Sequence, residues 1–367
     1  MDANAYTTPF QFTKSLRRDV YPAIDPKNPD LNAAGKVVLI TGAGGGIGGE
    51  TARARAIAGA EGIILVGRKA SLLQEPAEAI FSINKDVKLL IVTADLTSEA
   101  DVEELFSQAK TTFGKVDVVV NTAGTMTGGP IGDMTPQQWW TDFVSCPLPP
   151  DEFDTDVIQE VNVKGTYTLT HYYLKTFGSA GTLINLVSLG ASMTAPGISS
   201  YSTSKLAVIK LSEYLDAEKS DLRIFTLHPG IVAATESKRG MVVDAFTPFA
   251  KDPGMLTGAV SLYLATPKAE YLRGGFMSVN WDVEEMEKHR DEIKEKKLLK
   301  LAFLNGKLGP EGHTWEWHAQ LLSMDQRIEM KIILRQDGLS GDYFAGWLRA
   351  TRISDELSTL RSHSLEL

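Results

Sequence analysis

Seven short apolar runs, rich in β-branched residues, occur between residues 36 and 279, and longer amphipathic stretches separate them. Several runs are apolar at every position, which is typical of parallel strands buried on both faces. Strands that alternate with helical stretches predict a three-layer α/β sandwich. The predicted strands are KVVLI (36–40), GIILV (62–66), VKLLIV (87–92), VDVVV (116–120), TLINLV (182–187), LRIFTL (222–227) and GGFMSV (274–279).

A glycine-rich turn, TGAGGGIGGE (41–50), joins the first predicted strand to the first predicted helix. Gly42 permits a tight turn, Gly46 lets the backbone approach a pyrophosphate, and Gly48 allows close helix–strand packing. The free N–H groups and positive dipole end of the helix would face the phosphates. The turn therefore predicts a dinucleotide-binding, Rossmann-type doubly wound parallel sheet of about seven strands. The alternative is a flexible glycine-rich turn without a ligand.

The end of the second predicted strand bears on which dinucleotide is bound. A site that prefers NAD(H) has an acidic residue here to bond the ribose 2′-hydroxyl. Gly67 stands at that place and Arg68 follows it. A guanidinium can pair with a 2′-phosphate and stack on adenine, so NADP(H) is favoured over NAD(H). The alternative for Arg68 is a solvated surface side chain.

Further motifs follow the later strands in order. NTAG (121–124) follows the fourth strand, and Ser188 ends the fifth. YSTSK (201–205) starts thirteen residues after Ser188, and HPG (228–230) ends the sixth strand. Together with the glycine-rich turn, this set resembles the short-chain dehydrogenase/reductase family over residues 35–282. Thr122 departs from the family pattern, which has a second Asn there. Residues 21–34 and 272–302, which contain YPAIDP and NWDV, are similar to a filamentous-fungal subgroup.

The resemblance implies a catalytic set of Ser188, Tyr201, Lys205 and Asn162, the last from VNVKG (161–165). Tyr201 and Lys205 are four residues apart, so they share one helix face. A free phenol has a pKa of about 10, and a nearby ammonium lowers the pKa of a phenol. Tyr201 could then donate a proton to a carbonyl oxygen or accept one from an alcohol. Ser188 would polarise the same oxygen, and Asn162 would hold a water of a proton relay. Taken singly, these residues could instead be a core tyrosine, a strand-end cap and a helix hydrogen-bonder.

The same resemblance implies a set of contacts with the cofactor. Asp95 and Leu96 would contact the adenine, and the Pro-Gly motif would lie near the nicotinamide. No metal is expected. The implied cofactor-binding residues are Gly42, Gly46, Ile47, Gly48, Arg68, Asp95, Leu96, Asn121, Ala123, Gly124, Lys164, Tyr201, Lys205, Pro229, Gly230, Val232 and Thr235.

Composition excludes several other classes of partner. The formal net charge is −9, which argues against general nucleic-acid binding. Cys146 is the single cysteine, so no intramolecular disulfide can form and a reducing compartment is expected. No apolar run approaches the ~18 residues of a membrane span, and the N-terminus lacks the apolar region of a secretory signal.

We expect a cytoplasmic protein that acts on a small carbonyl or alcohol substrate. The resemblance implies a homodimer or homotetramer formed through the helices that bear Asn162 and Tyr201.

Three regions differ from the repeating strand–helix pattern. Residues 1–34 contain several prolines and predict an extended N-terminal arm before the catalytic domain at 35–282. Residues 144–159 form a proline-rich insert, which is either a surface loop or a translated intron. Residues 283–367 predict a helical C-terminal extension that begins with a charged helix, EEMEKHRDEIKEKKLLKL (284–301), and later contains Trp315, Trp317 and Trp347.

The predicted function is NADP(H)-dependent interconversion of a carbonyl and an alcohol on a small organic substrate. The subgroup resemblance suggests a role in secondary metabolism. One alternative is an enzyme of the same fold that catalyses a non-redox cyclisation or dehydration. The other is a non-catalytic NADP(H)-binding protein, which would normally have relaxed the Ser188, Tyr201 and Lys205 set.

Overall fold

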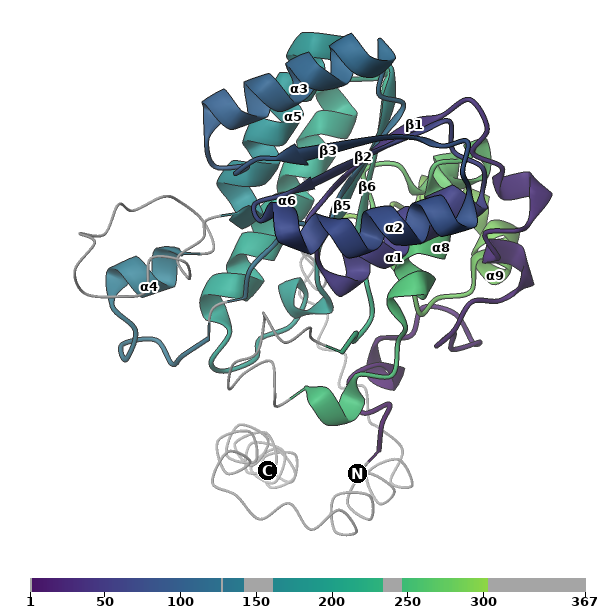
Figure 1. Cartoon of the computed structure of the whole chain (residues 1–367). Helices are drawn as coiled ribbons and strands as arrows, with labels where there is room; N and C mark the ends of the chain where they lie inside the picture. Colours follow the sequence, from purple (N-terminus) through teal and green to yellow (C-terminus); the bar gives the residue numbers. More distant parts are fainter. Residues whose placement is uncertain (1, 127, 142–160, 234–245, 303–367) are drawn as a thin grey trace, which may run out of the picture. The chain divides into compact units, whose positions relative to one another are not determined.

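A seven-stranded parallel sheet forms the centre of the computed structural model, with the strand order β3-β2-β1-β4-β5-β6-β7 (Figure 1). The model describes residues 2–126, 128–141, 161–233 and 246–302. These residues fall within one unit of tertiary contacts, Met1–Ala302. The strands are β1 (Val37–Thr41), β2 (Gly62–Gly67), β3 (Lys88–Thr93), β4 (Val118–Asn121), β5 (Gly181–Leu186), β6 (Leu222–His228) and β7 (Phe276–Ser278). The seven predicted strands are therefore confirmed, with ends that differ by at most two residues.

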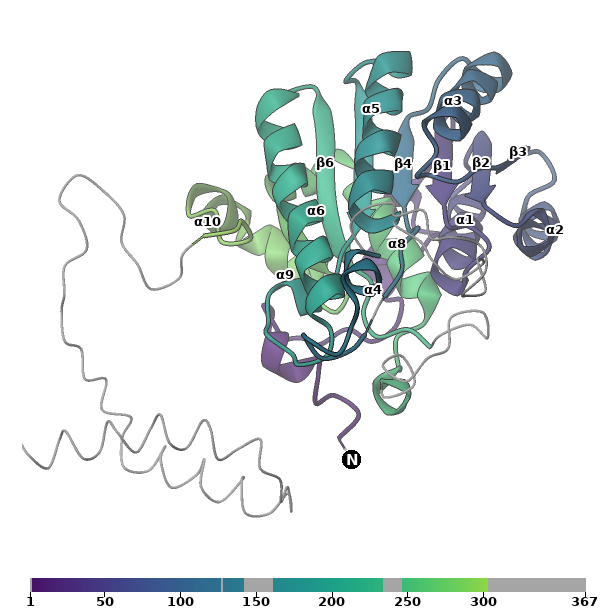
Figure 2. The ribbon, with the colours of Figure 1, turned by 90° about the vertical axis from the view of Figure 1, so that its left-hand side faces the viewer.

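Helices cover both faces of the sheet and complete the three layers. On one face α3, α5 and α6 lie side by side (Figure 2), and on the other face lie α1, α2 and α8. Neighbouring residues of β1 alternate between the two cores, because Val38 and Ile40 pack with α1 and α8 while Val37 and Leu39 pack with α3 and α5. The helices are α1 (Gly46–Ile57), α2 (Gln74–Ile83), α3 (Glu99–Phe113), α4 (Pro136–Trp140), α5 (Thr166–Phe177), α6 (Ser199–Glu218), α8 (Gly254–Leu264), α9 (Val283–Lys288) and α10 (Arg290–Glu295).

Close packing of α8 on α1 supports the helix that follows the glycine-rich turn. A Cβ on Gly258 would lie 2.8 Å from the Cβ of Ala54, so only a glycine permits this approach. Arg55 of α1 is buried and donates hydrogen bonds to the carbonyl and hydroxyl oxygens of Ser261, at 2.7 and 3.1 Å. Burial lowers the pKa of Arg55 to about 9. These contacts fix the direction of α1 relative to the sheet.

The N-terminal arm packs along the segment that follows β7. Leu16 pairs with Trp281 in an antiparallel bridge, and the Trp281 indole N–H donates to the Phe10 carbonyl at 2.9 Å. The Val283 N–H donates to the Tyr21 hydroxyl at 2.8 Å. Tyr21 and Ile24 are buried in the core shared with α1 and α8. The YPAIDP and NWDV motifs, which mark the fungal subgroup in the sequence, are therefore in direct contact.

The charged segment after Trp281 forms two short helices, whereas the sequence predicted one. α9 ends at Lys288 and α10 begins at Arg290, and His289 between them has a φ of −111° and a ψ of 17°, outside the helical region. Val283 and Met286 of α9 and Ile293 of α10 are buried, and the other residues of the two helices are charged. The insert at 144–159 and the three tryptophans after residue 309 lie outside the described residues. Within the described part of the chain, no helix is long and apolar enough to cross a membrane.

Candidate active site

The loops that carry the sequence motifs meet at one edge of the sheet. The sheet is parallel, so the segments after β1, β4, β5 and β6 all leave from its carboxyl edge. The strand order reverses between β1 and β4, and ligands of such sheets bind in the crevice at this point. The fold therefore brings together four motifs that are spread over nearly 200 residues.

The turn after β1 closes tightly because its glycines lie against one another. Gly42 has a φ of 64°, which favours glycine, and a Cβ on it would lie 2.9 Å from the Ala123 nitrogen. A Cβ on Gly48 would lie 2.8 Å from the carbonyl carbon of Gly42. The Ala43 N–H donates to the Val66 carbonyl at 3.1 Å and so ties the turn to the end of β2.

The first turn of α1 presents its backbone N–H groups at the crevice. The helix begins at Gly46, and the preceding Gly45 supplies no side chain to cap those groups. Gly46 is exposed and Ile47 is half-buried. An uncapped helix start on a glycine turn is a site for an anion such as a pyrophosphate.

The end of β2 carries a glycine where an acid would select NAD(H). A Cβ on Gly67 would lie 3.0 Å from Cδ2 of the buried Leu73, so the position is closely packed. Arg68 follows at the carboxyl edge and its side chain is exposed. Beyond β3, the Asp95 carboxylate accepts hydrogen bonds from the N–H and hydroxyl of Thr97, both at 2.8 Å. Leu96 is buried in the core beneath α3.

A buried polar network ties the NTAG segment to its neighbouring strands. Asn121 accepts a hydrogen bond from Thr41 at 2.7 Å and donates to Thr166 and Asn185 at 2.9 and 3.3 Å. Thr122, the departure from the family pattern, donates to the Thr41 carbonyl at 2.6 Å. A threonine hydroxyl at this position therefore joins β4 to β1. The network fixes the path of Ala123 and Gly124, which are half-buried at the rim.

Asn162 connects the NTAG segment to the helix that bears Tyr201. It lies in a π-helical turn, Val161–Gly165, that precedes α5, and its side chain is buried. Its amide oxygen accepts from the Thr125 N–H at 3.0 Å, and its amide nitrogen donates to the Thr125 carbonyl and to the Ser204 hydroxyl, both at 3.0 Å. Lys164 is half-buried in the same turn. Turns of this type are frequent at functional sites.

Lys205 is buried and faces the same cluster. Its ammonium nitrogen donates to the Leu186 carbonyl at 3.0 Å and lies 5.9 Å from the centroid of the Tyr201 ring. A Cβ on Gly124 would lie 3.1 Å from this nitrogen and 3.0 Å from the amide oxygen of Asn162. Tyr201 is half-buried one turn earlier on α6. The structure thus brings Lys205, Asn162 and Gly124 together beside the Tyr201 ring.

Ser188 follows β5 and is half-buried at the carboxyl edge. Its hydroxyl oxygen accepts a hydrogen bond from the Gly190 N–H at 3.0 Å, which holds the side chain in place. A Cβ on Gly190 would lie 3.2 Å from the Ser188 oxygen and 3.5 Å from the Ser202 oxygen. Ser188 therefore lies near Ser202 in the first turn of α6, and Ser202 is the residue that follows Tyr201 in the sequence.

The Pro-Gly turn follows β6 at the carboxyl edge of the sheet. Gly230 has a φ of 77°, and the next N–H, that of Ile231, donates to the Asp252 carboxylate at 2.6 Å. Pro229 accepts a hydrogen bond from Thr257 at 3.1 Å, and Val232 is half-buried. Thr235 lies outside the described residues.

His228 ties the end of β6 to the segment that carries Ser188. Its Nδ1 accepts the N–H of Leu189 at 3.3 Å, so the neutral ring carries its proton on Nε2. Burial lowers the pKa of His228 to about 3. In the unfolded chain the same ring takes up a proton near pH 6.5. The unfolded state therefore binds more protons between about pH 6.5 and 3, and the free energy of unfolding falls as the pH falls through that window.

We expect His228→Asn to reduce the acid sensitivity of the protein. The asparagine oxygen keeps a hydrogen-bond acceptor, while the titrating group is removed. Between pH 7.5 and 5.0 the wild type should lose about 2 kcal/mol more of its free energy of unfolding than the variant does. Chemical unfolding at the two pH values measures this difference. His289, whose side chain is exposed, provides the control variant His289→Asn. Equal acid-induced losses in wild type and His228→Asn would contradict the assignment.

Several groups in this cluster were not predicted from the sequence. Ser204 accepts from Asn162 and donates to the Tyr201 carbonyl at 2.7 Å, so it joins two residues of the predicted set. Its position inside YSTSK, on the same helix face as Tyr201, could have identified Ser204 from the sequence. The Leu186 and Thr125 carbonyls are backbone groups, which a residue pattern does not reveal.

Comparisons with known proteins agree with this geometry. The family model described as short chain dehydrogenase matches residues 36–242. The short chain dehydrogenase mpl6 of Monascus purpureus is 30% identical over 305 residues, which are 80% of this chain and 97% of that protein. The short chain dehydrogenase pigC of Monascus ruber is 30% identical over 308 residues, with 80% and 94% covered. The crystal structure of a short-chain type dehydrogenase/reductase from Mycobacterium marinum superimposes with a TM-score of 0.56 at 25% identity, covering 68% of this chain and 94% of that one. The chain belongs to the short-chain dehydrogenase/reductase family.

Proposed function

We propose that this protein is an NADP(H)-dependent oxidoreductase that interconverts a carbonyl and an alcohol on a small organic substrate. The observation that carries the proposal is the buried ammonium of Lys205 beside the Tyr201 ring, held by the Leu186 carbonyl two residues before Ser188. Burial of an ammonium is costly unless hydrogen bonds or an opposite charge stabilise it, and the Leu186 carbonyl supplies one such hydrogen bond. Here the ammonium lies next to a half-buried phenol at the carboxyl edge of the sheet.

In this proposal Tyr201 donates the proton to the substrate oxygen during reduction and accepts it during oxidation. The positive charge of Lys205 stabilises the phenolate that remains after donation. Ser188 donates a hydrogen bond to the same substrate oxygen and holds the carbonyl in place. The Asn162 side chain is hydrogen-bonded to Thr125 and to Ser204 of α6. It therefore holds the turn before α5 against α6 beside Lys205. The nicotinamide, when bound, supplies or accepts the hydride.

The residues at the turn after β1 suit a dinucleotide. Gly42 and Gly48 leave no room for a Cβ, which keeps the turn tight, and the uncapped start of α1 offers N–H groups for the pyrophosphate. Gly67 and Arg68 support NADP(H), because the first supplies no acid and the second places a cation after β2. The remaining cofactor-binding residues named from the family resemblance stay predictions.

We expect Arg68→Ala to change the cofactor preference. Loss of a charge-assisted hydrogen bond to a 2′-phosphate costs about 1.5–3 kcal/mol, so kcat/KM for NADPH should fall roughly 10- to 100-fold. The value for NADH, which lacks that phosphate, should change by less than about threefold and serves as the internal control. Steady-state kinetics with both cofactors measures the ratio. A parallel loss with NADPH and NADH would remove Arg68 from the 2′-phosphate site.

Two other functions are possible for a protein of this family, and the structure supports them less well. A non-redox cyclase or dehydratase would form product without consuming NADPH. A non-catalytic binding protein would bind NADPH and turn nothing over. The juxtaposition of Lys205, Tyr201 and Asn162 favours an enzyme over the second alternative. NADPH oxidation over a panel of ketones and aldehydes, with identification of the products, separates the three.

The remaining predictions from the sequence are kept as proposals. We propose the division into an arm at 1–34, a catalytic domain at 35–282 and an extension at 283–367.

A homodimer or homotetramer through α5 and α6 is supported by exposed apolar side chains on both helices, namely Tyr167 and Leu206. We propose a role in secondary metabolism from the resemblance of the YPAIDP and NWDV segments to a filamentous-fungal subgroup, and the substrate class and the cytoplasmic location remain part of the proposal.

A further inference from the structure

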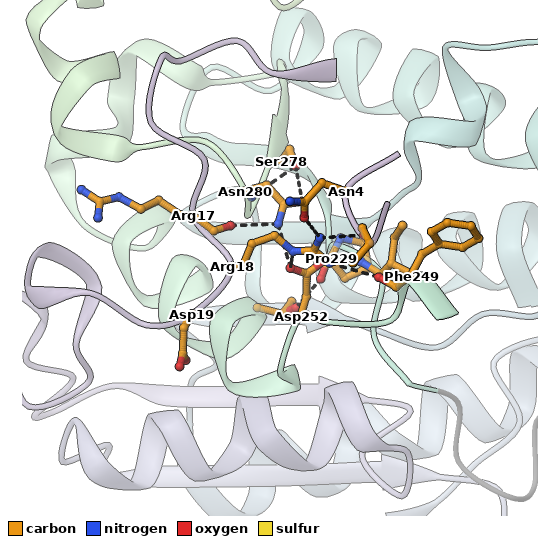
Figure 3. Close-up of polar contacts among 12 residues, drawn as sticks. Asn4, Arg17, Arg18, Asp19, Pro229, Phe249, Asp252, Ser278 and Asn280 are labelled. Carbon is orange, nitrogen blue, oxygen red and sulfur yellow. Dashed lines mark hydrogen bonds and ion pairs between the residues drawn. The ribbon is translucent and has the colours of Figure 1, made fainter. Parts of the chain in front are cut away.

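Asp252, which precedes α8, is a buried carboxylate on which three separate segments converge (Figure 3). One segment is the Pro-Gly turn, through the Ile231 N–H at 2.6 Å. The second is the segment after β7, through the Asn280 side chain at 2.9 Å. The third is the N-terminal arm, through the guanidinium of Arg18, which donates to both carboxylate oxygens at 2.6 and 3.2 Å.

Arg18 is the cation that balances this carboxylate, and each of its nitrogens is used. The nitrogen that reaches the second Asp252 oxygen also donates to the Phe249 carbonyl at 3.1 Å. The third nitrogen donates to the Asn4 side chain at 2.6 Å and to the Ala3 carbonyl at 3.3 Å. The fork geometry of a guanidinium makes such simultaneous contacts possible, and a lysine ammonium cannot reproduce them.

The Pro-Gly turn is packed directly against the Asp252 carboxylate. A Cβ on Gly230 would lie 2.7 Å from the carboxyl carbon of Asp252. The Asp252 N–H in turn donates to the Ile231 carbonyl at 3.2 Å. Turn and carboxylate therefore cannot shift independently, and Arg18, together with Asn280, holds the carboxylate in place.

We propose that Arg18 is a positioning residue of the active site, which acts through Asp252 to hold the Pro-Gly turn against the cofactor. The inference rests on the proposed function, because it takes the turn to lie beside the nicotinamide. It gives the N-terminal arm a role in catalysis, although the arm carries no residue of the predicted catalytic set. Displacement of a group that positions reactants by about 1 Å can cost ~10²-fold in rate.

The test compares Arg18→Gln with Arg17→Gln in the full chain. Both changes remove one positive charge and one ion pair of the arm, because Arg17 pairs with Asp282 and lies over the Tyr21 ring at 4.2 Å. Only Arg18 reaches Asp252. Hydrogen exchange of a peptide covering residues 229–233 should be at least about tenfold faster in Arg18→Gln and unchanged in Arg17→Gln. Equal exchange in the two variants would overturn the inference without any reference to activity.

Kinetics and cofactor binding give the second readout. Arg18→Gln should lower kcat/KM for the NADPH-dependent reaction by roughly 10- to 100-fold and weaken NADPH binding measured by fluorescence, while Arg17→Gln stays within about threefold of the wild type. Arg18→Lys keeps the charge but not the full set of hydrogen bonds, so its values should lie between those of Arg18→Gln and the wild type. If the wild type binds no NADPH, the proposed function fails. If the wild type turns over and Arg18→Gln matches Arg17→Gln, only this inference fails.

Discussion

Replacement of Tyr201 by phenylalanine is expected to slow hydride transfer by roughly 10²- to 10⁴-fold, the usual contribution of a positioned general acid. The substituted ring fills the same space on α6 and leaves the contact of Lys205 with the Leu186 carbonyl in place. NADPH affinity should therefore stay within about threefold of the wild-type value. Stopped-flow measurement of NADPH oxidation gives the rate, and a fluorescence titration gives the affinity.

The same helix offers a matched control for this variant. Tyr214 also lies near a lysine, with the Lys210 nitrogen 5.7 Å from its ring centroid, but it is 57% exposed. Tyr214→Phe removes an identical hydroxyl from α6 away from the crevice and should leave the rate unchanged. A Tyr201→Phe protein that keeps more than about a third of the wild-type rate would contradict the assignment of Tyr201 as the acid.

Gly48→Ala should strongly weaken NADPH binding. The added methyl group would meet the Gly42 backbone, so either α1 or the turn after β1 must move away from the pyrophosphate site. Forced overpacking of this kind costs about 1–3 kcal/mol, which corresponds to roughly a 5- to 150-fold loss of cofactor affinity if the turn is the part that moves. The shift in thermal unfolding temperature on addition of NADPH, compared with the wild type, measures the effect.

The neighbouring glycine provides the control for this prediction. A Cβ on Gly49 would meet the Ala43 carbonyl and the Pro76 ring at 3.5 Å, which is ordinary contact. Alanine also has a higher helix propensity than glycine, by about 1 kcal/mol. Gly49→Ala should therefore keep the NADPH-induced shift and be slightly more stable than the wild type. If both alanine variants bind NADPH equally well, the tight turn at Gly42 and Gly48 is not needed for cofactor binding.

The strands and the turn after β1 were predictable because their signals are local. Runs such as KVVLI are apolar at every position, and both faces of β1 are buried in the structure. The glycines of the turn are required by its backbone conformation and by close packing, and these requirements involve only a few neighbouring residues. Ser188, Tyr201 and Lys205 follow from the family resemblance at fixed spacing, and in the structure the Lys205 ammonium lies beside the Tyr201 ring and on the Leu186 carbonyl at the end of β5.

The contacts of the N-terminal arm could not be predicted, because they join residues far apart in the sequence. Arg18 and Asp252 are separated by 234 positions, and neither stands in a motif of the catalytic domain. The YPAIDP and NWDV motifs were both visible, yet only the folded chain shows that Tyr21 accepts the Val283 N–H. The π-helical turn at Asn162 and the break at His289 are likewise backbone features without a residue signature.

Transfer of deuterium from NADPH to the product tests the central claim most directly. NADPH that carries deuterium at both C4 positions is incubated with the protein and the carbonyl substrate found in the panel, and the product is analysed by mass spectrometry. The proposed function predicts one deuterium on the carbinol carbon of the alcohol for each NADPH oxidised, and almost no product with Tyr201→Phe. Product that forms without deuterium, or without loss of NADPH, would contradict hydride transfer and support the non-redox alternative.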